Sequence, residues 1–524
     1  MTVVAFFRSS SFFLSVLTSL LLWVSFPGGG EIWPILLVAL IPLLYSLFGV
    51  NTRSAIFCGL SCGLVHFTLL LYWIVTVLSK YGGLHWFLAV PALLLLALYM
   101  SLYFALFALL ARFILLVFPA AVSVWLLPAL WVGVDWLRAV LFTGFPWMDL
   151  GYGLFEVPVL VQIADLVGHY GVTFLVVLVN TCLMLILRLI VTRKTSVVTY
   201  AFVLVPVLCL LGGAGAYSTN RFAEEQQTSA APDTPRITVG IVQGNVDQSV
   251  KWSPAQQQDT VENYLRQTQA LFVSSHPSLV VWPETALPFY PPSSEYMQLL
   301  RDMVAGNSFA LLTGAPWYEI IDRKEKKVNF FNSALLLQPD GQYGGKYYKT
   351  HLVPFGEYVP LKKFLPFLAP LVEAVGDFRV GRIEHPLTWQ QARAGVLICF
   401  ESVFPDLSRQ WVLAGANMLV NLTNDAWYGK SSAPHHSLAM AVLRAVETRR
   451  SLVRSANTGI SAFVSPAGTI LRQSELFVPW AATSEVTLSQ ELTIWARYGY
   501  LFAPFCLLAG LLGGLIAAAK RRWA

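Results

Sequence analysis

Long apolar stretches fill the first 219 residues and constrain the fold of this chain more than any other feature. They cover roughly residues 12–26, 32–49, 55–79, 86–117, 120–141, 160–191 and 197–217, and an eighth covers 494–519. A helix needs about 20 apolar residues to cross a hydrocarbon core of about 30 Å. We therefore expect eight membrane-spanning helices. An alternative for the first two stretches, a signal peptide followed by one span, lacks a small-residue cleavage site after Phe26.

Charged side chains are concentrated after residue 219. Residues 1–219 carry 13 of them and residues 220–524 carry 51, and the whole chain is only 12% charged, against about 25% in soluble domains. This excludes a purely soluble protein and a disordered one. We expect a transmembrane bundle at 1–219, a polar linker at 220–235, a water-soluble domain at 236–492 and a final span with a basic tail at 493–524.

Lysine and arginine in short loops indicate which ends of the spans face the cytoplasm. On one side of the alternating spans lie Arg8, Arg53, Arg188, Arg193, Lys194 and the tail Lys520-Arg521-Arg522. The soluble domain is one span away from the last two clusters. We therefore expect this domain outside the cytoplasm and the C-terminus inside it.

The soluble domain alternates short β-branched runs with helical stretches. We predict strands at 237–242, 279–282, 310–314, 396–398, 418–421 and 462–464, and helices at 255–273, 405–414 and 435–450. This alternation indicates an α/β domain with a sizeable core. No basic stripe with interleaved aromatics is present, so we expect no nucleic acid partner.

Three reactive side chains stand where strands are expected to end: Glu284 after Trp-Pro, Lys349 among aromatics, and Cys399 after Val-Leu-Ile. Each alone has a structural explanation, and Cys399 could be a buried inert thiol. It is, however, the one cysteine of the soluble domain, so it has no disulfide partner there. A thiol is mostly protonated at neutral pH and attacks as the thiolate, so we expect its neighbours to ionise it. Glu284 could take the proton and Lys349 could stabilise a tetrahedral intermediate.

Three motifs carry a resemblance: Trp282-Pro-Glu-Thr, Lys349-x-His-Leu-Val-Pro-Phe-Gly-Glu and Ile398-Cys-Phe-Glu. In this order they resemble the Glu–Lys–Cys triad of the nitrilase (carbon–nitrogen hydrolase) superfamily. With Val242-Gln-Gly-Asn and the apolar stretches on both sides, essentially the whole chain resembles the apolipoprotein N-acyltransferase family. The resemblance implies an α/β plus membrane-α fold, in which a nitrilase-like αββα sandwich is carried on an eight-span helix bundle.

The resemblance also implies an activity and a location. An acyl chain would pass from a membrane phospholipid, phosphatidylethanolamine above all, through a cysteine thioester to the α-amino group of a diacylglyceryl-cysteine on a lipoprotein. It implies no cofactor and no metal. The enzyme would lie in the bacterial inner membrane, with its catalytic domain in the periplasm.

By position, the resemblance makes Cys399 the nucleophile, Glu284 the general base and Lys349 the oxyanion stabiliser. Glu357 and Glu401 match supporting carboxylates, although either could simply be a salt-bridge partner of Lys349 or of a nearby arginine. Phe400 also matches a supporting position, but it replaces a tyrosine common in the family, which puts any hydrogen bond there in doubt.

Substrate contacts are implied for three tryptophans, Trp147, Trp252 and Trp427, and core tryptophans are the alternative. The segment between Tyr358 and Phe378 is unusually apolar and rich in proline. It is either a core helix or a membrane-dipping arm in which Lys362 and Lys363 meet lipid phosphates.

Two other functions stay open at this point. A membrane-tethered amidase with the same triad would give the acyl group to water. A transporter would use the charges within its spans, where Asp135 and Arg138, and Asp165 and His169, are spaced as helical neighbours. The transporter hypothesis predicts that Cys399→Ser leaves activity unchanged.

Overall fold

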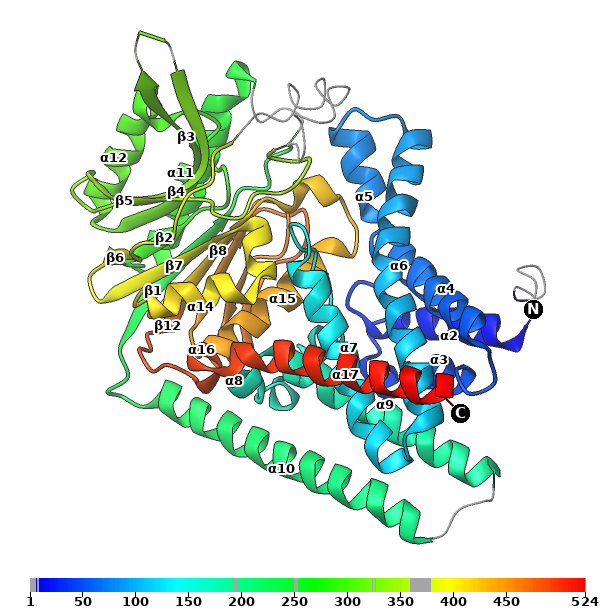
Figure 1. Ribbon diagram of the computed structural model, residues 1–524. Coiled ribbons are helices and arrows are strands. Elements are labelled where there is room, and N and C mark those ends of the chain that lie inside the picture. Colours follow the sequence, from blue (N-terminus) through cyan, green and yellow to red (C-terminus); the bar gives the residue numbers. More distant parts are fainter. Residues whose placement is uncertain are drawn as a thin grey trace. The chain divides into compact units, whose positions relative to one another are not determined.

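The computed structural model describes residues 6, 9–192, 197–248, 253–322, 324–325, 327–358 and 378–523 (Figure 1). The chain divides into two compact units. The first unit comprises Met1–Ala223, Ser431–Ala439 and Arg497–Ala524, and the second comprises Glu224–Lys430 and Met440–Ala496. The sequence did not reveal that a short piece of the soluble segment, Ser431–Ala439, belongs with the first unit.

The first unit is helical. Its elements are α2 (Ser10–Ser25), η1 (Trp33–Leu37), α3 (Ile41–Ser46), α4 (Thr52–Leu70), α5 (Trp73–Thr76), η2 (Val77–Tyr81), α6 (Trp86–Val117), α7 (Ala120–Val140), η3 (Leu150–Leu154), η4 (Pro158–Leu160), α8 (Ala164–Val167), α9 (His169–Thr192), most of α10 (Val197–Ala230), η9 (Gly499–Leu501) and α17 (Phe502–Trp523). A short helix, α16 (Ile494–Arg497), precedes η9.

Six helices in the described part of the chain are long and apolar enough to cross a membrane. They are Thr52–Leu70, Trp86–Val117, Ala120–Val140, His169–Thr192, Ala201–Ala230 and Gly499–Arg522. The two N-terminal stretches form shorter apolar helices, Ser10–Ser25 and Trp33–Ser46. Eight spans therefore stay a prediction, for which six helices have the required length.

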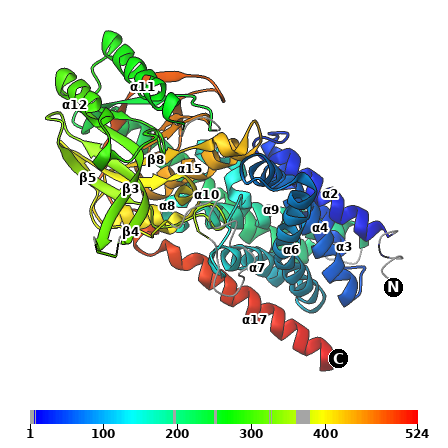
Figure 2. The same ribbon diagram turned by 90° about the horizontal axis from the view of Figure 1, so that it is seen from above.

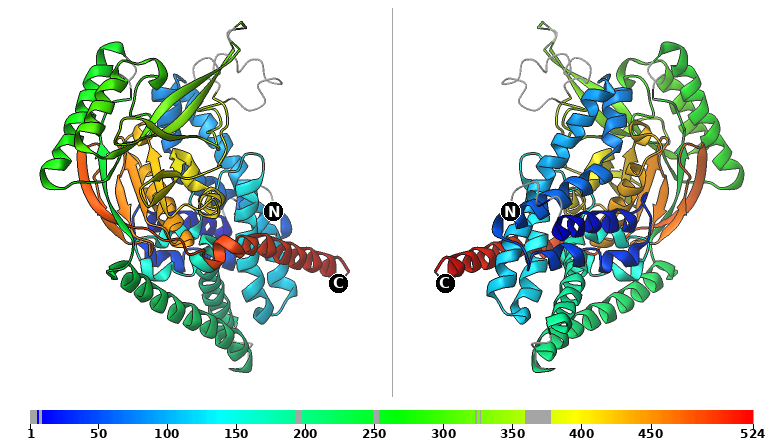
Figure 3. Two further views of the ribbon diagram at one scale, coloured as in Figure 1. Left: turned by 90° about the vertical axis from the view of Figure 1, so that its left-hand side faces the viewer. Right: turned by 90° about the vertical axis from the view of Figure 1, so that its right-hand side faces the viewer.

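The last helix packs closely against α7 because glycines face the contact. A Cβ at Gly133 would lie 2.4 Å from Cα of Leu507, and one at Gly510 would lie 2.5 Å from Cα of Leu130. Both distances are shorter than real Cβ contacts, so each glycine is needed for this approach. Figures 2 and 3 show α17 as one continuous helix that ends at the C-terminus.

Several buried charges in the first unit form ion pairs with one another. Arg138 lies 3.3 Å from Asp135, and it also pairs with Asp149. His169 approaches the other oxygen of Asp149 at 2.8 Å. The spacing suggested that Asp165 would neighbour His169 on one helix, but Asp165 instead pairs with an arginine of α10 at 3.1 Å. A glycine between α8 and α9 interrupts the helix that this pairing would require.

The second unit contains two six-stranded sheets. The first has the order β12-β1-β2-β3-β4-β5 and the second has the order β11-β10-β9-β8-β7-β6. In each, three neighbouring strands are parallel (β1, β2, β3 and β7, β8, β9) and the others are antiparallel. The strands are β1 (Arg236–Gln243), β2 (Leu279–Val281), β3 (Ala310–Asp322), β4 (Lys327–Leu337), β5 (Tyr343–Tyr348), β6 (Leu387–Trp389), β7 (Ala392–Ile398), β8 (Met418–Thr423), β9 (Leu452–Ala456), β10 (Ala462–Val464), β11 (Ile470–Gln473) and β12 (Trp480–Thr487).

The sheets pack face to face, and helices cover both outer faces. The hydroxyl of Ser455 in β9 donates to the carbonyl of Val281 in β2 at 3.3 Å, from one sheet to the other. Figure 1 shows α11 (Pro254–Ser274) and α12 (Tyr296–Asn307) beside the first sheet, and α14 (Pro405–Leu413) and α15 (Ala433–Thr448) beside the second. Three short 3-10 helices, η5 (Pro291–Ser293), η7 (Cys399–Val403) and η8 (Asp425–Tyr428), complete the unit. The expected αββα sandwich is confirmed.

Residues 220–235 differ from the expected linker. They continue α10 as far as Ala230, and β1 begins at Arg236. The polar run contains Glu224, Glu225 and two glutamines, which are good helix formers without any apolar period. The helix propensity of these residues therefore extends α10 into a segment in which the lack of a hydrophobic period had predicted a linker.

Candidate active site

Glu284 lies just beyond the carboxyl end of β2, after Trp282 and Pro283. Its side chain is buried, with 8% exposed. The next residue, Thr285, has a φ of +51°, so the chain turns sharply after the carboxylate. A Cβ at Gly314 in the neighbouring strand β3 would lie 2.6 Å from Cα of Glu284, which only glycine avoids. A strand end and a neighbouring glycine therefore fix the position of this carboxylate.

Lys349 follows β5 and is also buried, with 1% exposed. Its N–H donates to the carbonyl of Asn332 in β4 at 2.9 Å. Its Nζ lies 2.9 Å from Oε2 of Glu357 and 3.7 Å from Oε1 of Glu284. The side-chain amide of Asn332 donates to both carboxylates at 2.8 Å. One ammonium and two carboxylates thus form a compact buried group, in which Glu357 is the salt-bridge partner of Lys349.

Cys399 follows β7 and is the first residue of η7. Its φ of +52° lies in the left-handed region, where residues with a side chain are strained. The register of β7 and β8 pairs Ile398 with Leu422, so Cys399 and Thr423 follow at neighbouring strand ends. The charges of Glu284 and Lys349 both act on the thiol. The fold therefore brings together three residues that are 65 and 50 positions apart in the sequence.

The thiol of Cys399 is not ionised at rest, contrary to our expectation from the sequence. Burial raises the pKa of Cys399 to about 12, and the Glu284 carboxylate adds to the increase, while the Lys349 ammonium opposes it. The thiol is therefore protonated near neutral pH. This arrangement suits proton transfer to a carboxylate during attack, rather than attack by a preformed thiolate.

The amine of Lys349 is charged. Burial disfavours the ammonium, but the carboxylates of Glu357 and Glu284 outweigh this effect and raise the pKa of Lys349 above its ordinary value. A buried, fixed positive charge beside a nucleophile is suited to stabilise an oxyanion.

Glu401 binds the backbone on both sides of the site. It is fully buried, and its Oε1 accepts hydrogen bonds from Tyr347 Oη at 2.8 Å, Thr350 N at 2.6 Å, Thr350 Oγ1 at 2.8 Å and His351 N at 3.1 Å. Its Oε2 accepts from Ile398 N at 2.7 Å. These donors flank the candidate lysine and the candidate nucleophile in sequence. All five of these donors are neutral groups, and through them Glu401 holds the two segments together.

Phe400 lies in an aromatic cluster next to the nucleophile. Its ring centroid is 5.0 Å from that of Phe404 and 5.9 Å from that of His351, and 5% of the residue is exposed. Burial, and then the charge of Lys349, lower the pKa of His351 to about 4, so this imidazole is neutral and acts as a packing group.

The three tryptophans predicted to contact substrate have different environments. Trp427 lies in η8 and is 38% exposed. Trp147 belongs to the first unit, is only 1% exposed, and donates from Nε1 to Nδ1 of His436 at 3.2 Å. Trp252 and the apolar segment 359–377 lie outside the described residues. Among the residues that the structure describes, no group of three or more His, Cys, Asp or Glu side chains is placed to hold a metal ion.

Several residues of the site were not predicted from the sequence. Asn332 carried no signal because β4 was not predicted. The N–H of Asn424 donates to Oε2 of Glu284 at 2.9 Å, and this residue follows a strand that was predicted. The polar run Thr423-Asn-Asp at the end of that strand was the signal that could have identified it.

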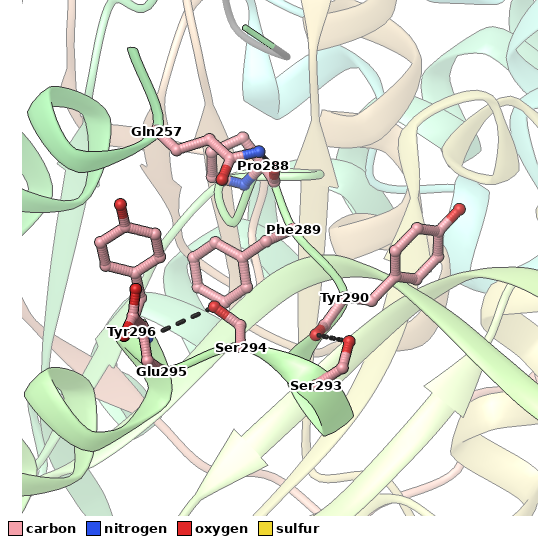
Figure 4. Close-up of a pocket in the computed structure, with 8 residues that line it drawn as sticks. All are labelled: Gln257, Pro288, Phe289, Tyr290, Ser293, Ser294, Glu295 and Tyr296. Atoms are coloured by element: carbon pink, nitrogen blue, oxygen red, sulfur yellow. Dashed lines mark hydrogen bonds between the residues drawn. The ribbon is translucent and has the colours of Figure 1, made fainter. Parts of the chain in front are cut away.

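A pocket of about 520 Å³ lies on the loop that follows Glu284 (Figure 4). Figure 4 shows the rings of Tyr290 and Tyr296 at opposite ends, with Phe289 between them. The pocket is lined by Gln257, Pro288, Phe289, Tyr290, Ser293, Ser294, Glu295 and Tyr296. None of the three candidate catalytic residues lines this pocket, so it is separate from the site of chemistry.

The chain is similar to known families and proteins over most of its length. Residues 18–182 match the family described as "Apolipoprotein N-acyltransferase N-terminal domain", and residues 238–493 match "Carbon-nitrogen hydrolase". The apolipoprotein N-acyltransferase of Geobacter metallireducens is 38% identical over 518 residues, which cover 97% of this chain and 96% of that protein. The apolipoprotein N-acyltransferase of Haemophilus ducreyi is 31% identical over 499 residues, which cover 92% of each chain.

Solved structures similar to this chain cover about half of it. The crystal structure of the carbon-nitrogen hydrolase from Helicobacter pylori G27 aligns with 48% of this chain and 89% of its own, with 17% identity and a TM-score of 0.37.

Proposed function

Since the chain belongs to the apolipoprotein N-acyltransferase family, we propose that it transfers an acyl chain from a membrane phospholipid to the α-amino group of the diacylglyceryl-cysteine of lipoproteins. The observation that carries the proposal is the buried group of Lys349, Glu284 and Glu357 beside the thiol of Cys399. It supplies a nucleophile, a proton acceptor and a fixed positive charge within one domain.

In the first half-reaction, Cys399 attacks the ester carbonyl of the phospholipid. Its sulfur forms a bond to the carbonyl carbon while its proton passes to the carboxylate of Glu284. The oxyanion that develops is stabilised by the ammonium of Lys349. When the intermediate collapses, the C–O bond of the ester breaks, and Glu284 returns the proton to the leaving oxygen. A lysophospholipid departs and a thioester remains on Cys399.

In the second half-reaction, the amine of the acceptor attacks the thioester carbonyl. Its nitrogen loses a proton to Glu284, and Lys349 again stabilises the oxyanion. The C–S bond then breaks, the proton returns to the sulfur, and the product is an amide. The same three residues serve both steps, so the site is restored without any cofactor.

Glu357, Glu401, Phe400 and the tryptophans have indirect roles in this proposal. Glu357 keeps Lys349 charged and in place, and Glu401 fixes the backbone around the lysine and the nucleophile. Phe400 contributes a ring to the packing at the nucleophile. We assign substrate contact to Trp427 because its side chain is partly exposed next to the site, and to Trp147 and Trp252 only from the family resemblance.

The donor, the membrane and the orientation are further parts of the proposal. Phosphatidylethanolamine is the donor to test first, and the bacterial inner membrane is the expected location. The distribution of lysine and arginine supports a periplasmic second unit and a cytoplasmic C-terminus. In a Cys209→Ser background, a membrane-impermeant maleimide should label Glu325→Cys in intact spheroplasts and Arg522→Cys only after permeabilisation. The reverse labelling would contradict the orientation.

The activity itself is tested with purified full-length protein, phosphatidylethanolamine vesicles and a synthetic diacylglyceryl-cysteine peptide. We expect the peptide to gain one acyl chain in amide linkage, and Cys399→Ser and Glu284→Ala to abolish this gain. Release of free fatty acid, with the peptide unmodified, would support the amidase hypothesis instead. Full activity in Cys399→Ser would refute the proposed nucleophile.

A further inference from the structure

The proposed base, Glu284, accepts hydrogen bonds from both sheets of its domain. Its Oε1 accepts from the side-chain amide of Asn332 in β4 at 2.8 Å, and its Oε2 accepts from the backbone N–H of Asn424 at 2.9 Å. Strand β4 belongs to the first sheet, whereas Asn424 follows β8 of the second sheet. The second sheet also contains β7, which leads into Cys399. The position of Asn424 therefore fixes the carboxylate relative to the sheet that carries the nucleophile.

The residue that follows Asn424 is anchored by a buried ion pair. Asp425 is 1% exposed, and its Oδ2 lies 2.8 Å from Nη2 of Arg454 in β9, which is fully buried. Its Oδ1 accepts from the hydroxyl of Thr423 at 2.8 Å. A Cβ at Gly459 would lie 2.0 Å from Oδ2, so that segment packs directly against the carboxylate. The backbone N–H that binds the base thus lies between two residues that this carboxylate holds in place.

The same guanidinium reaches the strand that ends at the nucleophile. Nη1 of Arg454 donates to the side-chain oxygen of Asn421 in β8, and Nε donates to the carbonyl of Ile460 at 3.1 Å. The side-chain amide of Asn421 in turn donates to the carbonyl of Leu397 in β7 at 2.8 Å. The strand register places Asn421 beside Leu397 and Arg454 beside Asn421. One buried side chain therefore anchors both the strand that leads to the nucleophile and the loop that binds the base.

We propose that Arg454 and Asp425 are a positioning pair for the acyl transfer, which fixes the carboxylate of Glu284 relative to the thiol of Cys399. This inference rests on the proposed function. A buried ion pair is often no more stabilising than apolar residues of the same size, so stability alone does not account for it. A guanidinium has five N–H donors in a fixed plane, which suits it to hold several acceptors in one geometry.

Loss of this anchor should affect the rate of chemistry more than substrate binding. A shift of about 1 Å in a reacting group can slow a reaction about 100-fold, so we expect thioester formation to slow about 10- to 100-fold. The phospholipid concentration at half-maximal rate should change little, because both side chains of the pair are buried. Loss of the Asn424 N–H would also remove a donor that favours the charged form of Glu284. The acid limb of the pH–rate profile should therefore move to higher pH by about one unit.

The pH profile must be separated from a simple change of charge. Several titratable groups surround the base and the nucleophile. They are Lys349 and Glu357 after β5, and Asp425 and Tyr428 in η8. Removal of the Asp425 charge alone would favour the ionised base and move the acid limb to lower pH. Asp425→Ala and Asp425→Asn both remove this charge, but only the amide keeps an oxygen that can accept from Arg454. The difference between these two variants therefore reports the anchor and not the charge.

The test uses purified full-length protein in a Cys209→Ser background and a p-nitrophenyl ester of a short fatty acid. Attack by Cys399 releases p-nitrophenol in a burst, which is corrected for the release measured in Cys399→Ser. We expect the burst rate to fall about 10- to 100-fold in Asp425→Ala, with its acid limb at higher pH than in Asp425→Asn, whose rate should stay closer to that of the unmodified protein. Asp406→Ala is the matched control, because the Asp406 side chain is 64% exposed on α14, and its rate and pH profile should be unchanged.

Arg454→Lys gives an independent result if Asp425→Ala does not fold. Lysine keeps the positive charge but cannot reach the three acceptors of Arg454 in one plane, so the burst should slow here too. Equal burst rates and acid limbs in Asp425→Ala and Asp425→Asn would overturn the inference, as would an unchanged rate in folded Arg454→Lys. A slower burst with an unmoved acid limb would also overturn it, because a structural role alone gives that result. The ester needs neither phospholipid nor lipoprotein, so the expected pattern would support the inference even if the proposed acyl donor were wrong.

Discussion

Glu401→Gln gives the most direct view of how the fold positions the site. The carboxylate accepts one hydrogen bond from Ile398 N and four from Tyr347, Thr350 and His351. Glutamine can place its single amide oxygen against the four donors of Tyr347, Thr350 and His351. Its NH₂ then faces the N–H of Ile398, and this buried donor loses its partner.

The magnitude follows from the donors left without a partner. One buried unsatisfied group costs about 1–3 kcal/mol. Each 1 kcal/mol lowers the unfolding midpoint of a domain this large by about 2–4 °C, so we expect a decrease of about 2–12 °C. In Glu401→Ala three backbone donors lose their acceptor, and the resulting cost of about 3–9 kcal/mol approaches the whole stability of a domain.

The assay is thermal unfolding of the purified protein in detergent, followed by the single-turnover rate of thioester formation. Glu401→Gln should be folded but slower, by about 10- to 100-fold, because Ile398 precedes the nucleophile and a shift of about 1 Å is enough for such a loss. The control is Glu319→Gln, whose side chain is 41% exposed, and its cost should be within about 0.5 kcal/mol. An unchanged midpoint and rate in Glu401→Gln would refute this reasoning.

Three more predictions follow from the same contacts. Lys349→Met removes the ammonium between Glu284 and Glu357, which both accept from the Asn332 amide, so one of the two carboxylates should take up a proton. Thioester formation should then fall at least about 1,000-fold in a single-turnover assay. A rate within tenfold of the original would contradict the role of the ammonium. Because burial raises the pKa of Cys399 to about 12, its alkylation by iodoacetamide in Cys209→Ser protein should rise about tenfold per pH unit from pH 6 to 9; a plateau near pH 7 would instead show a resting thiolate. Gly314→Ala should reduce the acylation rate sharply, because its methyl group would lie 2.5 Å from the backbone nitrogen of Thr285. The control is Gly306→Ala on α12, which has open space at its Cβ and should leave the rate unchanged. Equal rates in the two variants would refute the close packing behind Glu284.

The sequence predicted the elements that have a strong period or a long apolar run. The strands expected at 237–242, 396–398 and 462–464 lie within β1, β7 and β10, and the helix expected at 255–273 lies within α11. Antiparallel strands such as β4 and β5 were missed because they carry polar and aromatic residues without a clear alternation. Their pairing depends on contacts with neighbours that a local pattern does not contain.

The candidate site was predictable only in part. Glu284, Lys349 and Cys399 were identified by motif, and the structure brings them together. The protonation of the thiol was not predictable, because it depends on burial and on the balance between the charges of Glu284 and Lys349.

The central claim is that Cys399 carries the acyl group. Intact-mass analysis of the full-length protein, incubated with phosphatidylethanolamine and no acceptor, tests this claim most directly. We predict a gain of one acyl chain that maps to the Cys399 peptide, is released by hydroxylamine, and disappears when the lipopeptide acceptor is added. An unmodified Cys399 under these conditions, or an acyl chain on another residue, would contradict the account.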